Sequence, residues 1–269
     1  EYSPESFTGT EPEYALEVCN AVLDVWQPTP DNKVIINLPA TVENAMPHVF
    51  ATQIEYMNKN MKYRDGVVLS LHPHNDRGCG VAAAELGLLA GADRIEGTLF
   101  GNGERTGNVP LEAMVFEYAS LRGDFDGMNP TVITEIAEYL EKETGYETPP
   151  MTPFVGRNFN LTRAGIHADG IMKDPEIYNI FDTELILNRP PMVAISNTSG
   201  LAGIAVWINQ YYGLKGAEAI DKKNEGVVTI KELIDQEYAN GRITVISETE
   251  MIRYAEQYVF HRDVDYEDK

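Results

Sequence analysis

The first 108 residues alternate between strand-like and helix-like runs, and this alternation constrains the fold more than any other feature of the sequence. The strand-like runs are residues 33–38, 67–71 and 94–100, and the helix-like runs are residues 13–26, 49–61 and 81–90. The repeat is about 30 residues long, which is the size of a strand–helix–strand unit. Apolar strands separated by helices pair in parallel, because helices then cover both faces of the sheet. The sequence therefore predicts an α/β fold with a parallel sheet.

Polar residues follow the predicted strands at the points where these strands end. They are Glu5, Thr41, His72, His74 and Glu104. A (β/α)8 barrel collects its functional residues in this way, at the carboxyl ends of successive strands. A doubly wound sheet is the alternative, but its ligands gather at one switch point. The sequence holds only enough strands for half a barrel.

The alternation ends after Asn108. Helices are expected at residues 110–122 and 130–144, followed by a proline-rich linker at 149–153. Further helices are expected around residues 204–208, 230–238 and 248–260. We therefore predict two domains, a barrel region over residues 1–125 and a helical linker with small C-terminal subdomains over residues 126–269.

Composition excludes some partners and favours one compartment. The chain has 269 residues, 43% of them hydrophobic, and a formal net charge of -21. This charge argues against nucleic acids and anionic membranes as partners. Cys19 and Cys79 are too few for a disulfide framework, and no apolar run approaches the ~18 residues of a membrane span. With no signal-peptide pattern at the amino terminus, we expect a cytoplasmic protein whose acidic end, residues 263–269, is solvated.

His72 and His74 are the first candidates for chemistry. They stand two residues apart at the end of a predicted strand, so their side chains point to the same face. Neutral imidazole is a common ligand of divalent metals. An isolated His-x-His is also compatible with two unrelated surface histidines at a strand–loop junction.

The glycine-rich loop 101–108 supplies further candidates, Glu104, Arg105 and Asn108. The loop lacks the spacing of dinucleotide-binding and P-loop motifs. Arginine can bind a substrate carboxylate through two hydrogen bonds, and Asn108 can offer an amide oxygen to a metal. The alternative is a tight turn with a surface ion pair. His167, in the small-residue turn 165–170, and Tyr178 are not distinguished from ordinary residues by spacing alone.

Four motifs in order resemble one enzyme family. They are Ser3-Pro-Glu-Ser6, Leu38-Pro-Ala-Thr-Val-Glu43, Ser70-Leu-His-Pro-His-Asn-Asp-Arg77 and Gly101-Asn-Gly-Glu-Arg-Thr-Gly-Asn108. They are similar to motifs of the 2-isopropylmalate synthase, homocitrate synthase and Re-citrate synthase family, which are metal-dependent Claisen-type acyltransferases on a TIM barrel. The resemblance implies the C-terminal half of a (β/α)8 TIM barrel, strands 5–8, followed by a small mainly helical subdomain region. Residues 164–182 resemble the first of the family's subdomains.

The resemblance also implies a role for each candidate. His72 and His74 would bind a divalent metal, Mn, Mg, Zn or Co, with Asn108 at or near it. Glu5 and Thr41, joined by Arg105, would hold a 2-oxo acid, and Glu104 would face the acetyl-CoA co-substrate or the reacting carbonyl. His167 and Tyr178 would transfer protons. The enzyme would be a transferase that condenses acetyl-CoA with the 2-oxo acid.

Shorter stretches of the resemblance indicate which 2-oxo acid is the acceptor, and a missing motif indicates how the barrel is assembled. Residues 109–118 and 188–200 most resemble Re-citrate synthases, so oxaloacetate is the expected acceptor and citrate the product. 2-Isopropylmalate synthase and homocitrate synthase are the alternatives. The family's first strand carries an aspartate metal ligand beside an arginine, and nothing like it occurs here. We therefore expect either a homo-oligomer or an assembly with a chain that supplies strands 1–4. A non-catalytic partner chain or a truncated remnant is the alternative of another class.

Overall fold

A computed structural model describes residues 1–163 and 165–262. The chain divides into two compact units, Glu1–Thr148 and a second that begins at Pro149. The division after residue 125 stays a prediction, and Ala164 and the expected acidic end at 263–269 lie outside the described residues.

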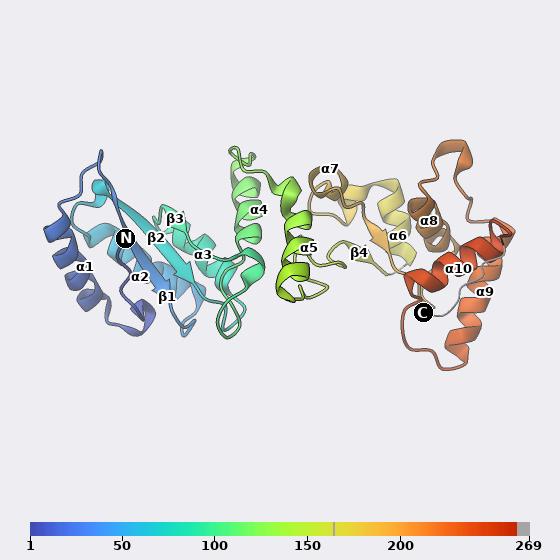
Figure 1. Ribbon diagram of the computed structural model, residues 1–269, viewed down its shortest axis with the longest axis horizontal. Helices are drawn as coiled ribbons and strands as arrows, with labels where there is room; N and C mark the ends of the chain where they lie inside the picture. Colours follow the sequence, from blue (N-terminus) through green and yellow to red (C-terminus); the bar gives the residue numbers. More distant parts are fainter. Residues whose placement is uncertain (164, 263–269) are drawn as a thin grey trace. The chain divides into compact units, whose positions relative to one another are not determined.

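The first unit is built on a parallel sheet. Its strands are β1 (Val34–Ala40), β2 (Val67–Pro73) and β3 (Arg94–Ile95), paired in the order β1-β2-β3 (Figure 1). Tyr2 adds a parallel bridge to β1 at Ile36. The predicted parallel α/β fold is therefore confirmed. Each strand lies beside its predecessor in the sequence, as in a barrel, and the described strands lack the reversal of order that marks a doubly wound sheet.

One face of this sheet is apolar and packs against helices. The helices are α1 (Pro12–Trp26), α2 (Pro47–Asn60) and α3 (Gly80–Leu89), each at a place where the sequence predicts a helix. Leu38 pairs in register with Leu71, and both are fully buried in the core that these helices share with the sheet. Because side chains alternate along a strand, Asn37 and His72 point to the opposite face. That face carries the polar groups of the candidate site.

The third predicted strand is shorter than expected. The sequence predicts a strand over residues 94–100, but β3 ends at Ile95 and Phe100 lies in the 3₁₀ helix η3 (Leu99–Gly101) with φ 60°. The cause is a change of hydrogen-bond partner, because Glu96 N–H still donates to β2, whereas Thr98 N–H donates to the carbonyl of Val109. The chain after Glu96 therefore leaves the sheet and pairs with its own returning loop.

The other elements of the first unit are helical. They are the 3₁₀ helices η1 (Phe7–Gly9), η2 (Arg64–Gly66) and η4 (Pro130–Val132), and the α-helices α4 (Leu111–Arg122) and α5 (Ile133–Thr144). Both α-helices lie where the sequence predicts them. Helix α4 follows the candidate loop directly, so it anchors the end of that loop.

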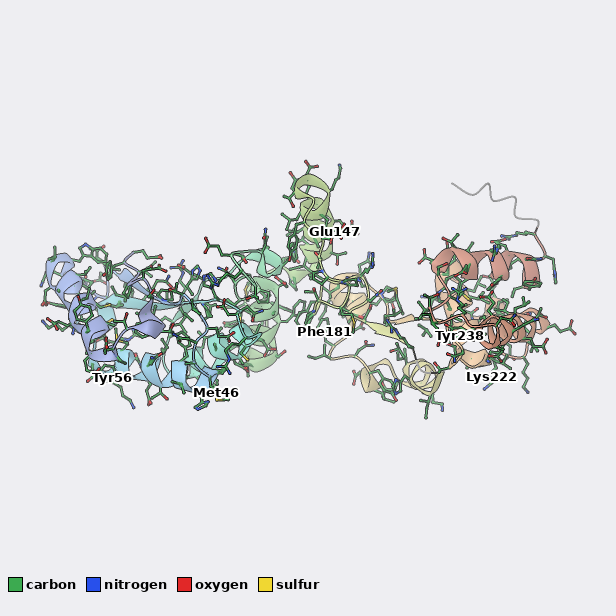
Figure 2. The ribbon with its side chains drawn as sticks, turned by 90° about the horizontal axis from the view of Figure 1, so that it is seen from below. Met46, Tyr56, Glu147, Phe181, Lys222 and Tyr238 are labelled. Carbon is green, nitrogen blue, oxygen red and sulfur yellow. The ribbon has the colours of Figure 1, made fainter. Side chains whose placement is uncertain are left out.

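The second unit is mainly helical, and β4 (Leu161–Thr162) pairs in parallel with β5 (Met192–Val193). Its helices are α6 (Gly165–Lys173), η5 (Pro175–Ile177), α7 (Thr183–Leu187), α8 (Leu201–Tyr212), η6 (Gly216–Glu218), α9 (Glu225–Ala239) and α10 (Glu248–Tyr258). A core of apolar side chains joins α8, α9 and α10. Figure 2 labels Lys222, in the loop before α9, and Tyr238 on α9, whose hydroxyl donates to the Thr244 carbonyl at 2.5 Å.

The small-residue turn predicted at 165–170 is wrong, because these residues form most of α6. Glycine at both ends of the run disfavours a helix by propensity. The ring of Tyr178 lies against Gly170, where a Cβ would come within 2.5 Å of the ring, so this helical position requires a glycine despite its low propensity.

Two expectations from composition concern the cysteines and membrane-spanning helices. Cys19 and Cys79 are free, with Cys19 buried. Burial raises the pKa of the Cys19 thiol to about 11. None of the helices in residues 1–163 and 165–262 is long and apolar enough to cross a membrane.

An ion-pair network in the second unit makes its stability depend on pH. Arg242 donates to both carboxylate oxygens of Glu250, at 2.7 and 2.6 Å, and lowers the pKa of Glu250 from 4.5 to about 2. A pKa lowered by folding stabilises the folded state above the unfolded pKa, and this stabilisation is lost as the pH falls. We expect about 2 to 3 kcal/mol of unfolding free energy to be lost between pH 5 and pH 2.

The test compares Glu250→Gln with the exposed control Glu248→Gln by urea unfolding. Trp207 reports on the second unit in a Trp26→Phe background. Glu250→Gln should remove this part of the pH dependence, and the control should keep it. Equal pH dependence in the two variants would contradict the assignment.

Candidate metal centre

His72, His74 and Asn108 converge at the carboxyl end of β2. His72 is in the strand and His74 follows it, and their ring centroids are 5.4 Å apart. The loop 101–108 returns beside β2, where Val109 N–H donates to the Pro73 carbonyl at 2.9 Å. An antiparallel bridge between His74 and Asn108 completes the contact. The structure thus brings the three predicted metal ligands together.

Hydrogen bonds on both ring nitrogens fix the orientation of His72. Its Nδ1 lies 3.1 Å from Oε2 of Glu96, and its Nε2 lies 3.0 Å from Nδ2 of Asn108. Because an amide NH2 only donates, Nε2 accepts and Nδ1–H donates to Glu96. The carboxylate thus keeps the lone pair of Nε2 directed at Asn108, the arrangement that supports histidine ligands of metals.

Sequence reasoning missed Glu96. It also accepts a hydrogen bond from the buried Asn37 amide at 3.1 Å and pairs with Arg94 at 2.8 Å. The available signal was a charged residue inside a predicted buried strand, since a charge at such a position requires a polar partner. The partner could not be identified from the sequence, because it lies on the neighbouring strand, 24 residues away.

His74 is suited to bind a metal as a neutral ring. Its Nδ1 is buried without a hydrogen-bond partner. Burial lowers the pKa of His74, and the nearby charge of Arg105 lowers it further. The ring is therefore neutral at neutral pH, and an unprotonated nitrogen is the form that binds a metal.

The two imidazoles suit a divalent metal, but the donor set is incomplete by itself. Two imidazoles and one amide converge, and the amide nitrogen of Asn108, rather than the expected oxygen, faces His72. Within the described part of the chain, no cluster of three or more His, Cys, Asp or Glu side chains could hold a metal. Metal sites of this type use three or four protein ligands, or fewer with substrate and water. A metal here would need a ligand from substrate or from outside these residues.

Arg105 is held by the protein itself. Its Nε and Nη2 donate to the two carboxylate oxygens of Asp76 at 2.6 and 3.1 Å, and Nη2 also donates to the Thr41 carbonyl at 2.6 Å. This pairing lowers the pKa of Asp76 to about 2. Arg105 thus ties the loops after β1, β2 and β3 together. Its role in binding substrate stays a prediction.

Thr41 and Glu43 belong to the same network. Thr41 Oγ1 accepts from the Ser6 N–H at 3.0 Å. Glu43 is buried, its N–H donates to Asp76 at 2.9 Å, and its Oε2 accepts from the Arg77 N–H at 2.5 Å. Glu43 is a second residue that sequence reasoning did not select. Together these bonds fix the three loop backbones around the histidines.

Glu5 and Glu104 are exposed side chains near this network. Glu5 precedes η1, next to the Ser6 that bonds Thr41. The side chain of Glu104 is 86% exposed, and its carboxylate lies 3.8 Å from Arg105. Both are accessible to a ligand, and their roles stay predictions.

His167 and Tyr178 lie together in the second unit. Their ring centroids are 4.5 Å apart with planes tilted by 39°. His167 is on α6 and Tyr178 follows η5, and both are exposed to solvent. The pair is thus available for proton transfer to an external molecule, which stays a prediction.

Gly107 is required by the shape of the loop. It has φ +89°, and a Cβ at this position would lie 1.9 Å from the Gly101 carbonyl oxygen. We expect Gly107→Ala to cost more than the ~1–2 kcal/mol of positive-φ strain alone and to displace Asn108. The matched control is Gly123→Ala, with φ +75° but nothing within 4 Å of the added Cβ.

Urea unfolding of the first unit measures this difference, with Trp26 as the probe in a Trp207→Phe background. Gly123→Ala should show the cost of strain alone. Equal losses of unfolding free energy in the two variants would mean that the Gly101–Gly107 contact does not hold the loop.

Comparison with known proteins gives a consistent set of matches. A model of the HMGL-like family matches residues 1–139. The 2-isopropylmalate synthase of Desulfitobacterium hafniense is 46% identical over 268 residues, which cover 89% of this chain and 48% of the relative. The citrate (Re)-synthase of Clostridium kluyveri is 52% identical over 180 residues, which cover 67% of this chain and 40% of that relative. The 2-isopropylmalate synthase of Helicobacter hepaticus is 44% identical over 239 residues, which cover 80% of this chain and 41% of that relative. The chain spans less than half the length of these curated relatives.

Proposed function

Because this chain belongs to the HMGL-like family, we propose that it forms part of a metal-dependent transferase that condenses acetyl-CoA with a 2-oxo acid. The family match agrees with the four motifs of the sequence. The observation that carries the proposal is the orientation of His72 by Glu96 beside Asn108 and the unpartnered, neutral His74. Relatives named 2-isopropylmalate synthase and citrate (Re)-synthase support the reaction class.

The residues of the site have distinct tasks in this reaction. A divalent metal, Mn, Mg, Zn or Co, held by His72, His74 and Asn108 would supply Lewis acidity at the ketone of the 2-oxo acid. Thr41 and Glu5 bind the 2-oxo acid, at the loop that Arg105 holds in place. Glu104, exposed at the rim, faces the acetyl-CoA.

His167 and Tyr178 move the protons. One removes a proton from the acetyl methyl group, and the resulting carbanion attacks the ketone carbon of the acceptor. The other returns a proton to the new alkoxide, and water then hydrolyses the thioester, which releases CoA and leaves the free acid. The adjacent, exposed rings of His167 and Tyr178 support this pairing of an acid with a base.

Residues 1–125 are the C-terminal half of a TIM barrel, strands 5–8, and residues 126–269 are a helical linker with the C-terminal subdomains. The sequential order of the strands supports this proposal. So does an apolar groove of about 460 Å³ beside β3, lined by Leu88, Ile95, Leu111, Met114 and Tyr118 among others. Strands 1–4 come from outside these residues, either in a longer polypeptide of which these residues are a part or in a second chain. The free cysteines support a cytoplasmic location.

Oxaloacetate is the acceptor that we favour, with citrate as the product. The support is the 52% identity to a citrate (Re)-synthase, although over a shorter match than the 46% identity to a 2-isopropylmalate synthase. 2-Isopropylmalate and homocitrate synthesis are the alternative reactions. A non-catalytic partner chain is the alternative of another class, supported by a donor set that is incomplete within the described residues.

An acceptor screen tests the proposal. The chain is co-expressed with the amino-terminal half of the Desulfitobacterium hafniense relative, and release of free CoA from acetyl-CoA is measured with several 2-oxo acids. Oxaloacetate should give the highest kcat/KM. A clear preference for 3-methyl-2-oxobutanoate or 2-oxoglutarate would replace citrate synthesis by isopropylmalate or homocitrate synthesis. Absence of CoA release with every acceptor would favour the non-catalytic alternative.

A further inference from the structure

Two side chains from different elements hold the backbone of Phe100 from both sides. Glu112, in the first turn of α4, accepts a hydrogen bond from Phe100 N–H through Oε2 at 2.9 Å. The hydroxyl of Tyr146, which follows α5, donates to the Phe100 carbonyl at 3.2 Å. Both polar groups of one residue are thus fixed by side chains that no part of the proposed reaction uses.

Phe100 determines where the metal-site loop begins. It has φ 60°, in the left-handed region that a bulky residue rarely adopts, so its conformation must be held by its surroundings. The next residue, Gly101, accepts a hydrogen bond from the Asn108 N–H at 3.1 Å. The backbone at residues 100 and 101 therefore sets the position of Asn108, and with it the contact of Asn108 with His72.

Glu112 is an unusual choice for a purely structural contact. It is only 2% exposed, and its second oxygen, Oε1, is buried without a hydrogen-bond partner. Burial of a carboxylate costs free energy that an apolar side chain would not. Burial raises the pKa of Glu112, and burial and the nearby Glu112 raise the pKa of Tyr146, so the tyrosine hydroxyl stays a donor.

We propose that Glu112 and Tyr146 are positioning residues of the metal centre, which hold Phe100 in its left-handed conformation and thereby place Asn108 against His72. The metal centre itself rests on the proposed function. The action of Glu112 and Tyr146 on loop 101–108 is independent of the proposed function, and it can be measured without metal or substrate.

Hydrogen exchange of the loop amides tests this action directly. The variants are Tyr146→Phe, which removes one hydroxyl, Glu112→Ala, and Glu112→Gln, which keeps an oxygen acceptor for Phe100 N–H. The matched control is Phe116→Leu, a buried change on α4 that leaves the hydrogen bonds of Phe100 intact. Tyr146→Phe and Glu112→Ala should speed exchange of the Gly107 and Asn108 amides by about tenfold, as expected for one lost hydrogen bond. Glu112→Gln should leave exchange of these amides as slow as in the unmodified protein.

Unchanged loop exchange in Tyr146→Phe would overturn the proposal, and so would equal acceleration in Phe116→Leu. The tyrosine variant decides the question even if Glu112→Ala does not fold. Co²⁺ binding by the assembled protein, followed by its visible absorption, is the second readout. Tyr146→Phe should weaken Co²⁺ binding by about tenfold. If the unmodified assembly binds no Co²⁺ and releases no CoA, the proposed function fails, while the exchange result still decides the role of Glu112 and Tyr146.

Discussion

The His72→Ala and His74→Ala variants are each expected to lose metal and at least about a thousandfold in turnover, because Lewis-acid catalysis supplies several kcal/mol of transition-state stabilisation. The cost in stability should be small. His72 is partly exposed, and Glu96, its hydrogen-bond partner, keeps Asn37 and Arg94 as partners. We expect about 1 kcal/mol or less of lost unfolding free energy.

Metal analysis and CoA release in the assembled enzyme check this prediction. The matched control is His48→Ala, which removes an exposed histidine of α2 in the same unit. The control should keep both metal and turnover. Full metal content and unchanged turnover in both His72→Ala and His74→Ala would exclude them as ligands.

The sequence predicts the features that depend on local pattern. β1 and β2 are mostly apolar, and α1, α2 and α3 alternate with the strands as clear helical runs. Because side chains alternate in a strand, the meeting of His72 with His74 also follows from spacing alone. The proximity of Asn108 to the two histidines was implied only by the family resemblance. The loop that carries Asn108 returns through hydrogen bonds with Pro73 and Asn75, which spacing does not predict.

What the sequence does not predict depends on long-range pairing. Glu96 reaches His72 only because β3 lies beside β2. Arg105, expected to bind a substrate carboxylate, pairs with Asp76, which is 29 residues away in the chain. The early end of β3 follows from the exchange of its hydrogen-bond partner at Thr98. Composition and periodicity do not identify the partners in any of these contacts.

The isolated 269 residues are expected to be inactive. β3 pairs with β2 through only two residues, Arg94 and Ile95, and a parallel barrel closes only when its last strand pairs with its first. An edge strand with an apolar groove beside it favours aggregation. The metal would also have only two imidazoles and one amide from the described residues. Weak metal binding and poor solubility should therefore occur together.

Co-expression tests this expectation, with the amino-terminal half of the Desulfitobacterium hafniense relative as the added chain. Solubility, metal content and CoA release should rise together in the co-purified complex. The His72→Ala variant serves as the control, because it should gain solubility from the added half without gaining turnover. Gain of solubility without turnover in this variant would show that the added half completes the fold and that turnover also requires His72.

The most direct measurement is metal content and turnover of the purified chain, determined side by side without and with the added half-barrel. We expect less than one metal per chain and no CoA release for the chain alone, and a full metal site with 2-oxo-acid-dependent CoA release for the complex. A monomeric chain that is metal-replete and fully active without the added half would contradict the half-barrel interpretation.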